Sequence, residues 1–120
     1  MKNIFRFNHE YEINKARYKE DDANFFACRM DNAPIAIFQM GNEYPLTILK
    51  DEMGEGFAID WKRHGLVSGD FNGDIRVWNN IEEDSLHYHY ESNVEDTKWV
   101  VENVLVSVSD NGFMNFWDIR

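Results

Sequence analysis

Three glutamates stand four to six residues ahead of an aromatic residue, in the pairs Glu12 and Tyr18, Glu55 and Trp61, and Glu95 and Trp99. If the aromatic residues mark equivalent points of a repeated fold, the three carboxylates line one edge of that fold. Carboxylates with overlapping fields attract cations and accept charge-assisted hydrogen bonds from Arg or Lys. Asn14, Phe57 and Asp96 flank them and add amide, aromatic and acidic groups. The spacing therefore predicts a surface that binds a basic protein or peptide.

The composition allows a simpler explanation of the same glutamates. The chain has 22 acidic and 12 basic residues among 120, and its formal net charge is −10. In a chain this acidic, three glutamates are also expected as solvated loop residues, so both interpretations stay open. The net charge argues against direct binding of nucleic acid, because that requires a basic surface.

The histidines are the other candidates for chemistry. His87 and His89 would point to one face of a strand, which is a spacing found in metal sites, but Cys28 or His64 would have to converge on them. A pair that faces solvent is the more ordinary arrangement. The sequence also has no Gly-rich phosphate loop, no zinc-type pair of cysteines and no nucleophile elbow. We therefore predict no cofactor, no metal and no enzymatic activity.

The elements that must position these residues repeat along the chain. Residues 66–79 align with residues 105–118 at a constant offset of 39, and residues 26–38 form a fainter copy that begins 40 residues before the first. Cys28 aligns with serines in the other two copies, so we expect it to be a small buried side chain. Three copies in register predict units of about 40 residues, over residues 9–49, 50–90 and 91–120.

Each unit is predicted to consist of short strands joined by tight turns. Strands are expected at residues 58–61, 66–68, 75–78 and 104–108, outer strands at 44–49 and 85–90, a strand and a turn at 15–22, and solvated turns at 50–52 and 82–84. Asn72-Gly73 and Asn111-Gly112 predict type I′ hairpin turns, in which both central residues need positive φ. Four short strands in about 40 residues are typical of a propeller blade, so the predicted fold is an all-β partial propeller of about three blades.

The number of cysteines and the length of the apolar runs indicate the cellular setting. Cys28 is the only cysteine, so an internal disulfide is excluded and a reducing compartment is expected. No run of apolar residues approaches the 18 or so of a membrane span. We expect a soluble intracellular protein, or a piece of one, with no membrane partner.

Short motifs at the ends and entries of the units carry a family resemblance. Residues 76–79 (Arg-Val-Trp-Asn) and 116–120 (Phe-Trp-Asp-Ile-Arg) resemble the last strand of WD repeats. The segments 8–18, 55–61 and 94–99 are similar, in order, to three consecutive blade entries of the nuclear histone-binding WD-repeat proteins, the retinoblastoma-binding and chromatin-assembly-subunit type.

This resemblance implies a function as well as a fold. It implies a WD-repeat β-propeller that recognises basic histone-type peptides, located in the nucleus with other subunits of a chromatin complex. The positions that match the family's peptide-binding residues are Glu12, Asn14, Glu55, Phe57, Glu95 and Asp96. It also implies that Asp70 and Asp110, which precede the predicted hairpin turns, brace the loop and strand backbones.

The sequence also resembles a second WD-repeat family, which implies a different function. Residues 68–70 (Ser-Gly-Asp) and the closing Trp-Asp-Ile-Arg also resemble the glutamate-rich WD-repeat chaperones that escort a ribosomal protein, which implies a scaffold or chaperone in ribosome biogenesis. The Asn-His-Glu opening at residues 8–10 favours the histone-binding family.

The chain departs from both families in its size. Both have about seven blades and an N-terminal helix, whereas this sequence has three units and no helical pattern, so a side pocket for a histone helix is in doubt. The Gly-His dipeptide usual before a WD unit is absent. Three blades leave two open flanks, for which the apolar candidates are Ile37, Phe38, Val106 and Phe116. We therefore expect self-association or completion by another chain.

Overall fold

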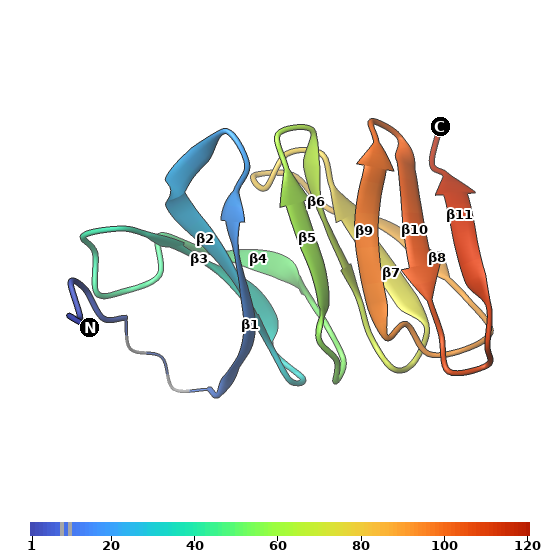
Figure 1. The fold of residues 1–120 in the computed structure, drawn as a ribbon, viewed down its shortest axis with the longest axis horizontal. Coiled ribbons are helices and arrows are strands. Elements are labelled where there is room, and N and C mark those ends of the chain that lie inside the picture. The colour runs from blue at the N-terminus through green and yellow to red at the C-terminus, as the bar shows by residue number, and fades with distance from the viewer. Residues whose placement is uncertain (8, 10) are drawn as a thin grey trace.

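Three antiparallel sheets lie side by side in the computed structural model, which describes residues 1–7, 9 and 11–120 (Figure 1). Blade 1 contains β1 (Ile13–Lys19), β2 (Asp22–Met30), β3 (Pro34–Gln39) and β4 (Thr47–Glu52). Blade 2 contains β5 (Ala58–Lys62), β6 (Gly65–Gly69), β7 (Asp74–Trp78) and β8 (Leu86–His89). Blade 3 contains β9 (Asp96–Val101), β10 (Val104–Val108) and β11 (Met114–Asp118). Each strand pairs with the next along the chain, so every blade is a meander.

This architecture confirms the predicted all-β partial propeller of about three blades. No helix occurs among the described residues. Blade 3 differs from the expected pattern because it has three strands. β11 therefore pairs only with β10 and forms the free edge of the sheet. β4 begins at Thr47 rather than at residue 44, because Pro45 lies in the preceding loop. The predicted turn at residues 50–52 is wrong, since these residues form the end of β4.

The two predicted hairpins are present, but their turn type is not the predicted one. Gly73 and Gly112 have φ of +94° and +87°, whereas the asparagine before each has negative φ. The Gly73 N–H donates to the Asp70 carbonyl at 3.1 Å, and the Asp70 N–H donates to the Asp74 carbonyl at 3.0 Å. This is a type I turn followed by a left-handed glycine, the common three-residue hairpin loop. Only the glycine needs positive φ.

The hydrophobic core lies between the blades and uses two kinds of sheet face. The aliphatic face of blade 1 presents Ala27, Ile35 and Ile37, and that of blade 2 presents Val67, Ile75 and Val77. The aromatic face of blade 2 presents Trp61, Leu66 and Trp78, and that of blade 3 presents Trp99, Leu105 and Trp117. Each aliphatic face packs on the aromatic face of the next blade, which confirms that the repeated tryptophans belong to the core.

The outer flanks differ from the expected pair of open surfaces. Ile37 is fully buried between blades 1 and 2, so its assignment to a flank is wrong. Phe38 does face the outer flank of blade 1, but it is also fully buried, because Phe7 of the N-terminal segment packs on it. At the other end, Val106 is half-buried and Phe116 is 65% exposed, as predicted. Among the described residues, the flank of blade 3 is open, and the flank of blade 1 is covered only in part, since Tyr18 on the same face is 57% exposed.

Candidate functional site: an acidic rim

The predicted site residues lie at the beginnings of the first strands of the three blades. Glu12, Glu55 and Glu95 precede β1, β5 and β9, and these first strands contact one another in that order. All three strands begin at the lower edge in Figure 1, together with the turns β2–β3, β6–β7 and β10–β11. We call Glu12, Glu55, Glu95 and the flanking Asn14, Phe57 and Asp96 the acidic rim. Of the 8–10 opening that suggested the family, Asn8 and Glu10 lie outside the described residues.

The three glutamates were expected to lie at equivalent points of the repeat. The register of the strands places them at different positions. Lys15, Ala58 and Asp96 are equivalent, because they pair with matching residues of the second strands, Arg29, Gly69 and Val108. Glu55 lies three residues before its pair and Glu95 only one residue before, so Glu95 takes the position of Phe57 rather than that of Glu55. In blade 1 a register shift between Ile13 and Lys15 interrupts the count, so Glu12 is not level with Glu55. Asn93 occupies the Glu55 position in blade 3.

Asn14 joins the rim of blade 1 to that of blade 2. Its Nδ2 donates to Asp31 Oδ1 at 2.6 Å and to the Gly56 carbonyl at 3.4 Å. Asp31 Oδ1 also accepts from the Gly56 N–H at 3.1 Å. Asn14 therefore serves to hold the loop before β5, and its amide is already engaged. Glu12 is exposed, and no hydrogen bond or ion pair joins its carboxylate to any described residue.

Glu55 and Phe57 present a carboxylate and an aromatic ring at the centre of the rim. Glu55 Oε1 accepts a long hydrogen bond of 3.5 Å from Asn32 Nδ2, and its carbonyl accepts from the Phe71 N–H at 2.8 Å. Phe57 is 45% exposed, and its ring centroid lies 6.2 Å from that of Phe71. The two loops thus form an exposed aromatic pair beside the carboxylate, and such a pair can contact the face of a cationic side chain.

Blade 3 contributes two carboxylates to the rim, those of Glu95 and Asp96. Glu95 Oε1 accepts a hydrogen bond from Asn93 Nδ2, and the Glu95 N–H donates to the Val108 carbonyl at 2.8 Å. Asp96 Oδ1 accepts from the Thr97 N–H at 2.9 Å at the start of β9. Asp96 is half-buried and engaged with backbone, so Glu95 is the more available carboxylate of the two.

The rim glutamates have no internal counterions. Across the described residues, every ion pair between a carboxylate and a Lys or Arg lies outside Glu12, Glu55 and Glu95. The three carboxylates come from one edge of a chain with net charge −10. This arrangement attracts cations and leaves acceptors free for them.

A buried arginine that the sequence analysis missed supports the rim from beneath. Arg29 is fully buried in β2, and its guanidinium donates to the carbonyls of Met30 at 2.6 Å, Gly54 at 2.8 Å and Gly69 at 3.1 Å. Burial lowers the pKa of Arg29, while the charges of Asp70 and Asp31 oppose the shift. Arg29 thus links β2 to the loop that carries Glu55. The available signal was a charged residue inside an otherwise apolar segment.

Asp70 braces the same region, as predicted. Its Oδ1 accepts from the N–H groups of Asn72 and Asp74, both at 3.0 Å, and its Oδ2 accepts from the Gly54 N–H at 3.0 Å. The same prediction is wrong for Asp110, which is exposed and accepts only a 3.4 Å contact from Ser92 Oγ among the described residues. The hydrogen bonds of Ser109 show that it, rather than Asp110, holds the Asp70 position in blade 3.

The histidine pair is engaged with a carboxylate. His87 Nε2 and His89 Nδ1 contact the same Asp74 Oδ1, at 2.8 Å and 3.0 Å. Cys28 is buried in β2, and the ring of His64 packs edge-on against Trp99, so neither joins the pair. Within the described residues, no group of three or more His, Cys, Asp or Glu is arranged to hold a metal ion. In the same part of the chain, no helix is long and apolar enough to cross a membrane.

Three meander blades joined aliphatic face to aromatic face define a segment of a WD-type β-propeller. Solved structures share this fold: the computationally designed Ika4 protein matches 93% of this chain and 69% of its own, with a TM-score of 0.77 and 22% identity. The computationally designed Ika8 protein matches 92% of this chain and 34% of its own, with a TM-score of 0.78 and 21% identity. No family model matches the sequence.

The homologues of this chain are WD-repeat proteins. Glutamate-rich WD repeat-containing protein 1 of Dictyostelium discoideum is 30% identical over 138 residues, which cover 94% of this chain and 28% of the relative. Histone acetyltransferase type B subunit 2 of Aspergillus oryzae is 24% identical, over 98% of this chain and 32% of the relative. Protein HEAT STRESS TOLERANT DWD 1 of Arabidopsis thaliana is 34% identical, over 66% of this chain and 19% of the relative. The chain spans about a third or less of the length of these relatives.

Proposed function

We propose that this chain is a non-enzymatic binding module whose acidic rim recognises a basic, histone-type peptide within a nuclear chromatin assembly or modification complex. The observation that carries the proposal is a set of three rim carboxylates at one edge of the blades, none of which forms an ion pair with a Lys or Arg of the described residues. The relatives named as subunits of a histone acetyltransferase support the choice of partner.

The geometry also indicates how a peptide would be held. Glu12 and Glu95 offer exposed carboxylates at the two ends of the rim, and Phe57 with Phe71 offers aromatic surface between them. One exposed ion pair contributes only about 0.2–1 kcal/mol. Useful affinity therefore needs several carboxylates acting on one peptide, with apolar contact at the aromatic pair. Salt screens such pairs, so affinity is expected to fall as ionic strength rises.

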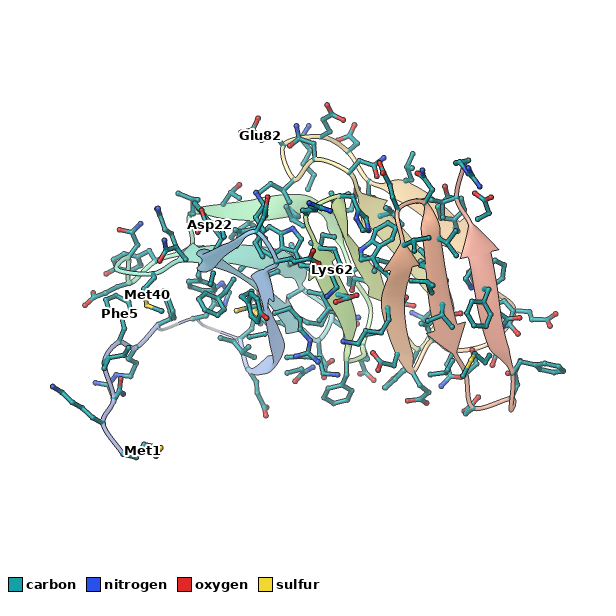
Figure 2. All side chains as sticks on the ribbon, turned by 45° about the horizontal axis from the view of Figure 1, so that its top comes forward. Met1, Phe5, Asp22, Met40, Lys62 and Glu82 are labelled. Carbon is teal, nitrogen blue, oxygen red and sulfur yellow. The ribbon has the colours of Figure 1, made fainter. Side chains whose placement is uncertain are left out.

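The test compares two variants with the same change in charge. The rim variant carries Glu12→Gln, Glu55→Gln and Glu95→Gln, which keep the side-chain shape and remove the charges. The control variant carries Glu82→Gln, Glu83→Gln and Glu102→Gln, which are exposed residues of the turns at the opposite edge (Figure 2). Calorimetric titration with a peptide of a core histone tail should show binding to the parent and the control, and none to the rim variant.

The control variant distinguishes binding at the acidic rim from attraction by the net charge of the whole chain. If both variants lose affinity equally, the net charge of the chain rather than the rim binds the peptide. If the rim variant binds as tightly as the parent, the rim is not the site. Thermal unfolding of both variants should stay within a few degrees of the parent, because the replaced side chains are exposed or only weakly engaged.

The alternative function is a scaffold or chaperone in ribosome biogenesis. It is favoured by the higher identity to the glutamate-rich WD-repeat relative, 30% against 24% for the histone acetyltransferase subunit. Affinity capture from nuclear extract, with purified core histones and ribosomal proteins as competitors, distinguishes the two. Displacement of the captured partners by ribosomal proteins alone would favour this alternative.

A further inference from the structure

The two junctions inside the chain use the same pair of surfaces. In both, a residue triplet from the aliphatic face of one blade packs on the triplet of large side chains from the aromatic face of the next. The strand pairings make the triplets equivalent: Trp61, Leu66 and Trp78 lie side by side across β5, β6 and β7, as Trp99, Leu105 and Trp117 do across β9, β10 and β11. A junction between blades is therefore always aliphatic on aromatic.

The two ends of the chain display the two halves of such a junction. On the aliphatic face of blade 3, Val106 is half-buried, while Met114 and Phe116 are 61% and 65% exposed, because no blade covers them. The corresponding aliphatic side chains of blades 1 and 2 are at most 3% exposed. On blade 1 the equivalent of the aromatic triplet is Tyr18, Phe26 and Phe38, which pair across β1, β2 and β3.

The N-terminal segment, residues 1–7, covers part of that aromatic face. The Phe7 ring lies 5.0 Å from the ring of Phe38 and 6.5 Å from that of Phe26, and Phe5 packs on Phe7 at 5.1 Å. The rest of the segment has little contact, since Ile4 is 82% exposed and Met1 projects away from the sheets (Figure 2). No backbone hydrogen bond joins residues 1–7 to any other described residue. The cover therefore depends mainly on Phe7, with His9 as a second contact whose ring lies 6.1 Å from that of Phe38.

We propose that copies of this chain associate head to tail, with the aliphatic face of blade 3 in one copy packed on the aromatic face of blade 1 in the next. The N-terminal segment competes for the same aromatic face and must be displaced. The occupant is a second copy because the chain itself supplies the surface that an aliphatic face meets at both internal junctions. A dimer that pairs like faces would instead place one aliphatic face against another, for which the chain has no precedent. Repetition of the internal junction turns successive copies in one direction, and such heterologous contacts form a ring where the rotation closes and an open filament where it does not.

The first test measures mass against concentration in the full chain. Sedimentation equilibrium from low to high micromolar concentration should show the 14.2 kDa monomer assembling as concentration rises. Phe7→Ala should move the midpoint to about tenfold lower concentration, because it removes the apolar contact of the competing segment. Phe116→Glu should abolish assembly. Phe113→Glu is the matched control, since Phe113 is 63% exposed but precedes β11 on the opposite side of the sheet, and it should change nothing.

The second test distinguishes head-to-tail association from a dimer in which two aliphatic faces meet. Tyr18→Glu blocks the aromatic face and Phe116→Glu blocks the aliphatic face, so each variant alone should remain monomeric. Mixed together they retain one intact junction and should form a one-to-one complex. The proposal is overturned if parent and Phe7→Ala both stay monomeric, if Phe116→Glu assembles as the parent does, or if Tyr18→Glu alone still dimerises. None of these outcomes depends on peptide binding at the acidic rim.

Discussion

Truncation of the Asp70 side chain should destabilise the protein more than any change at an exposed carboxylate. Asp70 is 2% exposed, and its carboxylate accepts hydrogen bonds from three backbone N–H groups that belong to the β6–β7 turn and the loop before β5. Asp70→Ala leaves these three donors without their acceptor and removes a negative charge near the buried guanidinium of Arg29. Water cannot replace the carboxylate without entering the junction between blades 1 and 2.

The expected magnitude follows from those contacts. A hydrogen bond to a charged group contributes about 1.5–3 kcal/mol, and such terms are not additive when local relaxation occurs. We expect Asp70→Ala to lower the free energy of unfolding by about 4 kcal/mol, a large part of the 5–15 kcal/mol typical of a domain. Asp70→Asn retains Oδ1 for two of the donors and loses the bond to Gly54 and the charge, so about 2 kcal/mol is expected.

Urea denaturation followed by tryptophan fluorescence measures these changes, because the four tryptophans lie in the core-forming repeats. Asp110→Ala is the matched control. It removes an exposed aspartate from the corresponding hairpin of blade 3, and it should change the free energy of unfolding by no more than about 0.5 kcal/mol. The reasoning is refuted if Asp70→Ala lies within about 1 kcal/mol of the parent, or if Asp110→Ala costs as much as Asp70→Ala.

Two further predictions concern titrating groups. Burial raises the pKa of the Cys28 thiol to about 11, so a thiol reagent at neutral pH should modify the native protein far more slowly than the urea-unfolded chain; equal rates would contradict this. For Asp74, burial raises the pKa, but the hydrogen bonds from the two histidines of β8 outweigh it and hold the pKa below its usual value. The stability that this carboxylate adds is present above its unfolded pKa of about 3.9 and is lost as pH falls through the lower folded value. Between about pH 5 and pH 3, urea midpoints should therefore fall more for the parent than for Asp74→Asn, and parallel curves would exclude the contribution.

Much of the fold could be predicted because the residues that form the core recur at regular intervals along the sequence. The tryptophans of blades 2 and 3, at offsets of 38 and 39, occupy the same face of their blades, and burial on that face leaves little freedom in their spacing. Features without periodicity were missed. Lys50 and Asp51 form part of β4 because an outer strand can keep an exposed lysine, and because Asp51 is bonded to Ser85 and Arg76 of blade 2. The cover that Phe7 gives to Phe38 has no repeated counterpart, so no pattern in the sequence could indicate it.

The hairpin turns show how a correct location can accompany a wrong geometry. Asn-Gly is frequent in type I′ turns, but the buried carboxylate of Asp70 binds the N–H groups of residues 72 and 74 and thereby favours a type I turn. The glycine then takes the left-handed position, and the asparagine keeps an ordinary conformation. The blade 3 hairpin has the same backbone hydrogen bonds with Ser109 in place of Asp70, so the carboxylate supports this turn type without being required for it. In both hairpins the Asn-Gly dipeptide indicated the place of the turn and not its type.

The rim was predicted less well because glutamates at unequal distances from the aromatic residues, six before Tyr18 and Trp61 but four before Trp99, were assigned to one edge position. Between the aromatic residue and the rim, β1 contains a register shift near Ile13 and Lys15, which the other first strands lack at that point. Equal distances in sequence therefore do not mean equal positions in space. In the observed register, Glu95 takes the position of Phe57 and Asn93 that of Glu55, while the register shift in β1 displaces Glu12 relative to Glu55. Under the proposed function, a peptide that crosses all three blades would therefore meet the carboxylates at unequal repeat positions. The order of its cations, as well as their number, should then affect the affinity.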